Sequence, residues 1–112
     1  MRPDLVAKLE ATVREAMAAG IRYGDWFGPD NRGPILHGIF LFEQAPSKEV
    51  EQAIAAGGSS CYFVDYPKWR GYRIAPGGDF PDYRRRYSAE AGAIILQDAG
   101  FNATMFEKYH LP

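Results

Sequence analysis

The stretch ILHGIFLFE, residues 35–43, decides the fold predicted for this chain. Branched and aromatic side chains occupy both sets of alternating positions, so an extended strand here would have two apolar faces. A strand of this kind belongs in the middle of a sheet, where both faces are covered. The sequence therefore predicts a central strand, with His37 in register with Ile39 and Leu41 and its ring hydrogen-bonded inside the protein.

The residues before this strand predict a helix and a loop. Apolar residues recur at helical spacing over residues 5–19, and Gly20 is placed to end that amphipathic helix. Residues 23–34 are rich in glycine and proline, which predicts a loop that carries Trp26 and Phe27.

The residues after this strand predict two more strands and three helices. A short crossover helix capped by Ser47 runs to residue 56, strands over 61–65 and 69–74 form a hairpin, and two C-terminal helices are capped by Ser88 and Asn102. The sequence thus predicts a single α+β domain, residues 1–112, with a small mixed sheet of about three strands and helices on one face.

Composition excludes several classes of protein. The single cysteine, Cys61, cannot form an intrachain disulfide, and the first residues lack the apolar run of a signal peptide, so a cytoplasmic location is expected. No apolar run approaches the roughly 20 residues of a membrane span, so no membrane association is expected. The net charge of −1 is not that of a strongly basic nucleic-acid-binding protein.

The charges are nevertheless segregated along the chain. Residues 66–87 contain six cationic and two acidic side chains, mixed with aromatic residues, whereas the remainder is acidic. Arginine binds carboxylates and phosphates bidentately and stacks on rings, and tyrosine and arginine dominate many protein interfaces. The predicted partner-binding residues are Trp26, Tyr66, Lys68, Trp69, Arg70, Tyr72, Arg73, Arg84, Arg85 and Arg86. The alternative is that the tyrosines are packing residues and the arginines a solvated rim.

The C-terminal segment allows two interpretations. Ala99, Gly100, Phe101, Asn102 and Phe106, followed by Tyr109, resemble the turn and second helix of a helix-turn-helix DNA-binding motif. Two core-packing helices joined by glycine explain the same pattern, and the second helix would offer a single cation, Lys108.

Catalytic and cofactor sites have little support in the sequence. Cys61 with His37 is the one nucleophile and base that can be named, but a strand follows Cys61 where an activating helix would be needed. Two histidines and one cysteine do not fill the usual zinc ligand sets, and the glycine pairs lack the lysine of a phosphate-binding loop. No cofactor and no metal are expected.

Three functions therefore remain in the order in which the sequence supports them. The first is a non-enzymatic binding or inhibitory protein that engages a macromolecule, a protein in preference to nucleic acid, for example in a nucleic-acid-handling complex. Inhibitors of host defence encoded by mobile elements are an analogy for such small chains. The second is a small enzyme that uses Cys61 with His37, and the third is a structural subunit of a larger assembly, with the oligomeric state left open.

Overall fold

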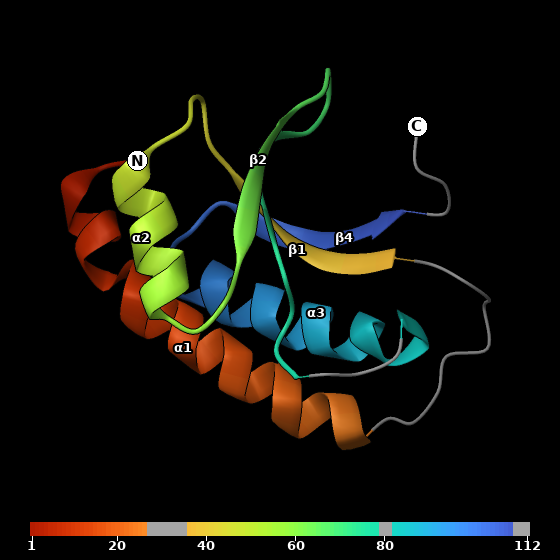
Figure 1. Cartoon of the computed structure of the whole chain (residues 1–112). Coiled ribbons are helices and arrows are strands. Elements are labelled where there is room, and N and C mark those ends of the chain that lie inside the picture. The colour runs from red at the N-terminus through yellow and green to blue at the C-terminus, as the bar shows by residue number, and fades with distance from the viewer. Residues whose placement is uncertain (27–35, 79–81, 109–112) are drawn as a thin grey trace.

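The computed structural model describes residues 1–26, 36–78 and 82–108, which contain three helices and four strands (Figure 1). Within these ranges, the side chains of residues 25–26, 36, 82–85 and 108 are not described. The elements are α1 (Pro3–Trp26), β1 (Leu36–Phe42), α2 (Lys48–Ala56), β2 (Cys61–Asp65), β3 (Arg70–Ile74), α3 (Asp82–Asp98) and β4 (Ala103–Lys108).

The four strands form one sheet in the order β2-β3-β1-β4, and every neighbouring pair is antiparallel. β1 lies between β3 and β4, so the predicted central strand is confirmed. The predicted mixed sheet of about three strands is corrected to an antiparallel sheet of four. From β1 onward, the order strand, helix, strand, strand, helix, strand in this arrangement is that of a split β-α-β fold.

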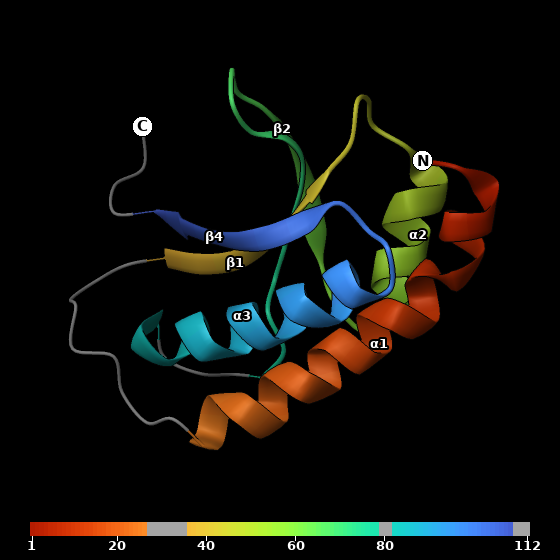
Figure 2. The ribbon, with the colours of Figure 1, turned by 180° about the vertical axis from the view of Figure 1, so that it is seen from behind.

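The described helices cover one face of the sheet. Seen from behind in Figure 2, α3 runs along β1 and β4, and α1 lies beyond α3, while α2 packs beside α1 and β2. The core between the layers joins apolar side chains from both, among them Leu9, Val13, Ile39, Leu41, Ile54, Tyr72, Ile74 and Leu96. No helix of the described ranges lies on the opposite face of the sheet (Figure 1).

α1 is longer than the sequence predicts, because Gly20 does not end it. A Cβ on Gly20 would lie 2.5 Å from the Ser88 Oγ atom and 3.1 Å from the Gly77 nitrogen, so this glycine serves the close approach of α1 to its neighbours. Ser88 is not the cap of α3, which begins six residues earlier. Ser88 is buried, and its hydroxyl donates a hydrogen bond of 2.5 Å to the Gly77 carbonyl oxygen.

The predicted second C-terminal helix is wrong, and with it the helix-turn-helix interpretation. Gly100, with φ +95°, follows the end of α3, and residues 103–108 then form β4 along the open edge of β1. Phe106, predicted to lie in that helix, is buried on one face of the sheet, and Ala103 is buried on the other, because successive side chains of a strand point to alternate faces.

Candidate binding surface

Strand register divides the side chains of the sheet between two faces. Residues directly opposite each other on neighbouring strands share a face, and Ile39, which contacts the helix position Gly92, identifies the face that packs on the helices. The face without helices is called here the outer sheet face. Its described side-chain positions are Gly38, Phe40 and Phe42 on β1, Tyr62 and Val64 on β2, Gly71 and Arg73 on β3, and Thr104 and Phe106 on β4.

A cluster of four aromatic rings covers the middle of the outer sheet face. Phe40 is fully buried there, with its ring centroid 5.1 Å from that of Trp69 and 5.0 Å from that of Phe42. Trp69 also stacks on Phe42 at 5.7 Å and meets Phe106 edge to face at 5.4 Å. These separations are those of favourable aromatic pairs, so the cluster acts as a second small core.

The position of Trp69 depends on the turn between β2 and β3. The Tyr66 and Trp69 backbones exchange hydrogen bonds of 3.1 and 3.2 Å, which closes a tight hairpin as the sequence predicts. Gly71, the residue that pairs with Phe42, adds no side chain to the outer face, and the indole of Trp69 occupies that space against Phe42. Trp69 is half-buried, so it lies at the edge of the aromatic cluster with part of its side chain accessible to solvent.

Arg73 lies beside the cluster with its guanidinium between two rings. Its Cζ atom is 4.5 Å from the centroid of Phe106 and 5.1 Å from that of Tyr62. Both rings attract the cation, and the long stem of Arg73 covers apolar surface on the way. Arg73 is thus held in place on the outer sheet face, next to a Tyr62 ring that is 53% exposed.

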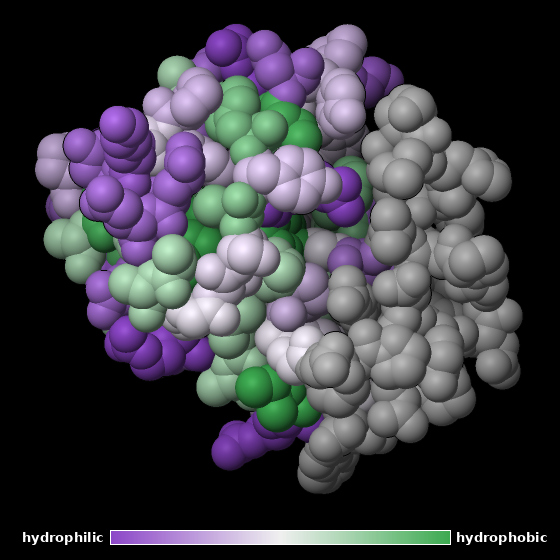
Figure 3. Space-filling model, viewed as in Figure 1, coloured by the Kyte–Doolittle hydropathy of each residue, from purple (hydrophilic) through white to green (hydrophobic). Residues whose placement is uncertain are grey.

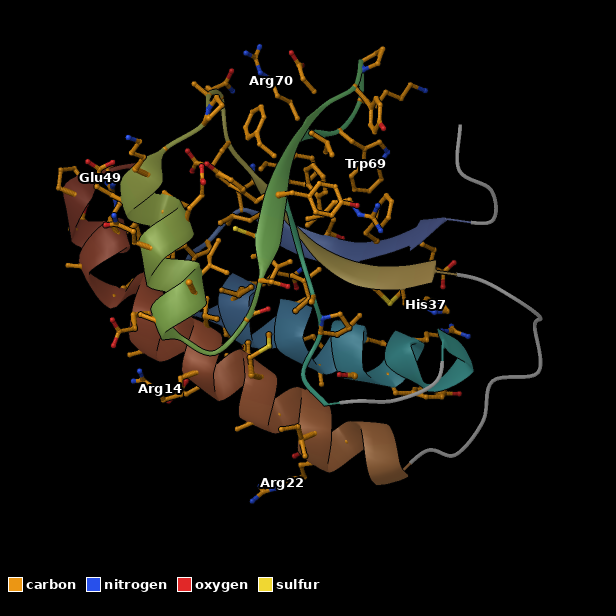
Figure 4. All side chains as sticks on the ribbon, in the orientation of Figure 1. Arg14, Arg22, His37, Glu49, Trp69 and Arg70 are labelled. Carbon is orange, nitrogen blue, oxygen red and sulfur yellow. The ribbon has the colours of Figure 1, made fainter. Side chains whose placement is uncertain are left out.

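The tip of the hairpin projects from the body of the protein and carries cations. Lys68 and Arg70 are exposed, as is Tyr66 at 47%. Figure 4 shows Trp69 and Arg70 on the hairpin, on the side of the molecule away from Arg22 in the helix layer. Arg70 lies 3.6 Å from Asp65 across the hairpin, and an exposed pair of this kind contributes little to stability.

The structure brings together only part of the predicted partner-binding set. Tyr66, Lys68, Trp69, Arg70 and Arg73 share the hairpin and the outer sheet face.

Two other predicted residues lie elsewhere. Tyr72 is fully buried on the helix side of the sheet, so its ring is closed to a partner. Arg86, on α3, is half-buried with its Nε atom 3.9 Å from the Glu107 carboxylate. The side chains of Trp26, Arg84 and Arg85 lie outside the described residues, so their part in binding stays a prediction.

Tyr72 attaches α2 to the sheet. Its hydroxyl donates to the Glu51 carboxylate at 2.6 Å and accepts from the Ser47 nitrogen at 2.7 Å. Burial, together with the hydrogen bond to Glu51, raises the pKa of Tyr72 from 10.0 to about 12. The hydroxyl proton is therefore part of the contact that fixes the start of α2 (Lys48–Ala56).

We expect this contact to weaken in strong alkali. Because the folded state raises the pKa of Tyr72, its contribution to the free energy of unfolding is complete below pH 10 and is lost as the pH rises towards about 12. An ultraviolet titration of the folded protein should show a tyrosine ionisation near pH 12, and Tyr72→Phe should remove that step. A titration of Tyr72→Phe indistinguishable from wild type would contradict this assignment.

Cys61 and His37 do not form a nucleophile and base pair. Cys61 is on β2 and His37 on β1, with β3 between them, and a spacing of about 4.8 Å per strand separates the two residues by roughly 10 Å or more. Burial, with a smaller effect of Glu51, raises the pKa of the Cys61 thiol, which is the opposite of activation. His37 is buried as predicted, with its Nε2 atom 3.4 Å from Glu107.

Other classes of site are weakly supported in the described part of the chain. No group of three or more His, Cys, Asp or Glu side chains that could bind a metal occurs among the described residues. None of the helices in the described ranges combines the length and apolar character needed to cross a bilayer. Comparisons with protein-family models, with curated proteins and with solved structures each found no match for the chain.

The helix layer has a surface feature of its own. An apolar groove of about 510 Å³ lies between α1 and α3, with Tyr23 and Ile94 at its exposed rim. Elsewhere the helices are more polar, and Figure 3 shows hydrophilic residues gathered over α2 and the first turns of α1. The groove has one charged lining residue, Glu90, whereas the outer sheet face and hairpin combine aromatic residues with several cations.

The sequence did not predict the aromatic cluster of the outer sheet face. The sequence places Phe40 and Phe42 in a central strand but does not say which face of the sheet they occupy, and it places Phe106 in a helix. Strand alternation in β3 was the available signal, since it places Arg73 and Tyr72 on opposite faces although the two residues are adjacent.

Proposed function

We propose that this protein is a non-enzymatic binding protein that engages a protein partner through its outer sheet face and the β2–β3 hairpin. The observation that carries the proposal is the combination of an aromatic cluster with Arg73 held beside it and two exposed cations, Lys68 and Arg70, on the adjoining hairpin. Rings and arginines held in place lose little conformational freedom on binding, which favours affinity. The contact residues of the proposal are Tyr62, Tyr66, Lys68, Trp69, Arg70 and Arg73.

A protein partner is favoured over nucleic acid by the accessibility of the rings. Sheet modules that bind single-stranded RNA stack bases on exposed aromatic rings. Here Phe40 and Phe106 are at most 8% exposed, so their faces are covered by neighbours within the cluster. Tyr62 and Tyr66 remain exposed, but tyrosines at the edge of a hairpin equally suit a protein interface.

Charge supports the same choice. The hairpin from β2 to β3 offers Lys68, Arg70 and Arg73, and Arg70 is already paired with Asp65. Nucleic-acid binding relies on contacts to many phosphates, and the chain as a whole carries a net charge of −1. Two or three cations are better matched to acidic residues of a protein surface.

The test is affinity capture from a native extract, with and without nuclease, using a variant of the hairpin tip. Tyr66→Ala combined with Lys68→Glu removes one exposed ring and reverses one exposed charge. We expect partner affinity to fall by about tenfold or more, because truncating a central interface residue commonly costs this much. Capture by the wild type should survive nuclease treatment.

The matched control makes the same two changes in the helix layer. Tyr23→Ala combined with Arg22→Glu also removes an exposed ring and reverses an exposed charge, on α1. This control should capture the partner as the wild type does. If the control loses capture and the hairpin variant retains it, the binding surface lies on the helices and the proposal fails.

A further inference from the structure

A small pocket opens beside Arg73, at the end of β3 where the strand leaves β1. Its volume is about 160 Å³, and it is lined by His37, Gly38, Ser60, Tyr62, Arg73, Ile74, Ala75 and Pro76. Ligand and cofactor sites usually occupy 300 to 1,000 Å³, so this pocket is too small for a whole cofactor. It has the size of a site for one functional group of a larger partner.

The pocket is open because glycine occupies the strand position beside it. Gly38 lies on the outer sheet face opposite Phe106 on β4, and a Cβ at this position would approach only the Ile74 carbonyl oxygen, at 3.5 Å. The lack of a side chain at Gly38 leaves room between Arg73 and the strand. Arg73 reaches across this space to Phe106.

The guanidinium of Arg73 contacts two rings and has no carboxylate partner among the described residues. Its Cζ atom lies over the rings of Phe106 and Tyr62, and these cation–π contacts provide no hydrogen-bond acceptor for its five N–H donors. In the described ranges, no carboxylate lies within 4.0 Å of Arg73 and no hydrogen bond from its side chain is found. The described residues that line the pocket include no acidic residue.

We propose that this pocket binds a carboxylate of the partner protein, with Arg73 as the bidentate donor. The inference rests on the proposed function and names the chemical group that its partner presents. A planar guanidinium matches the two oxygens of an aspartate or glutamate side chain. Ser60 and Tyr62 also line the pocket, and each carries a hydroxyl group that can act as a hydrogen-bond donor.

Size and charge favour a side-chain carboxylate over a nucleic-acid phosphate. A nucleic-acid phosphate is bonded directly to two sugars and has no side chain to carry it into a pocket of about 160 Å³. An acidic side chain, in contrast, reaches the pocket on a flexible stem while its backbone stays at the rim.

The test uses a small probe, so that it does not depend on the partner. Blocked tetraglutamate is titrated into ¹⁵N-labelled protein while NMR follows the backbone amide signals of the pocket residues Gly38 and Ala75 and, in the wild type, the side-chain Nε–Hε signal of Arg73, with blocked tetraglutamine as the uncharged comparison. We expect a saturable shift with tetraglutamate alone. Arg73→Met should weaken apparent affinity by about tenfold or more, as expected for a charge-assisted bidentate contact.

Two further variants separate charge from geometry and from folding. Arg73→Lys keeps the charge and the stem but loses the planar fork, so it should weaken binding several-fold, and it tests the same site if Arg73→Met fails to fold. Arg22→Met removes one positive charge from α1 and should bind tetraglutamate as the wild type does.

The result that overturns the pocket proposal is an Arg73 signal that does not respond to tetraglutamate, or equal binding by Arg73→Lys and wild type. Saturable, Arg73-dependent binding of pentathymidylate that is tighter than that of tetraglutamate would instead assign the pocket to a phosphate. A protein that captures its partner through the hairpin tip but ignores tetraglutamate would refute this inference and leave the proposed function standing.

Discussion

Phe40→Asp is expected to abolish soluble expression of the folded protein. Phe40 is fully buried in the central strand, where its ring contacts Phe42, Trp69 and Phe106. Loss of a buried phenylalanine ring alone costs about 3 to 5 kcal/mol, and an aspartate there adds the desolvation of a charge. These losses together approach the whole free energy of unfolding of a typical domain, about 5 to 15 kcal/mol.

Tyr62→Asp is the matched control for this experiment. Phe40 on β1 and Tyr62 on β2 are both directly opposite Arg73 in the strand register. An aspartate at either position would therefore lie next to the same arginine. Tyr62 is 53% exposed, and Tyr62→Asp should therefore remain folded. Soluble yield and thermal unfolding are compared for both variants. A Phe40→Asp protein with wild-type yield and melting temperature would refute the assignment of Phe40 to a second core.

Among the glycines whose surroundings the structure describes, Gly71 is expected to be the one where replacement by alanine is most damaging. Gly71 lies inside β3 with φ +149°, a conformation that side chains resist, at a cost of about 1 to 3 kcal/mol. A Cβ there would also overlap the Leu41 carbonyl oxygen and lie 2.9 Å from the Phe42 Cα atom. Because these are backbone atoms of the central strand, relief requires β1 and β3 to separate, and we expect a loss of roughly 4 kcal/mol or more.

Gly100→Ala separates backbone conformation from overlap. Gly100 has φ +95°, but a Cβ there would meet no atom within 4 Å. Its replacement should cost only the conformational part, about 1 to 2 kcal/mol. Urea denaturation of both variants measures the difference. Equal losses at the two positions would mean that the overlap at Gly71 is relieved without disturbing the sheet.

Much of the sheet was predictable because its signals are local. The apolar run of β1 and the turn residues between β2 and β3 identified three strands and one hairpin correctly. β4 could not be identified in this way, since Met105, Phe106 and Glu107 tolerate a helix, and their strand conformation comes from pairing with β1. Gly20 was misread for a similar reason, because close packing between helices leaves no mark in the local sequence.

The candidate surface was predictable only as a composition. The mixture of arginine and aromatic residues indicated the hairpin, but the contacts that fix Trp69 and Arg73 involve Phe40 and Phe106, which are distant in sequence. Register decides which side chains share a face, and register depends on which strands pair. The burial of Tyr72 beside an accessible Arg73 is a direct result.

The place of β4 in the sheet also determines when the sheet can be completed during translation. About 60 residues separate the end of β1 from the start of β4, and synthesis at about 5 to 20 residues per second takes roughly 3 to 12 s to cover them. Strand pairing takes microseconds, so β1 can pair with β3 long before β4 exists. For those seconds the most apolar strand of the nascent chain has an open edge, the kind that recruits other chains, and β4 is the strand that closes it.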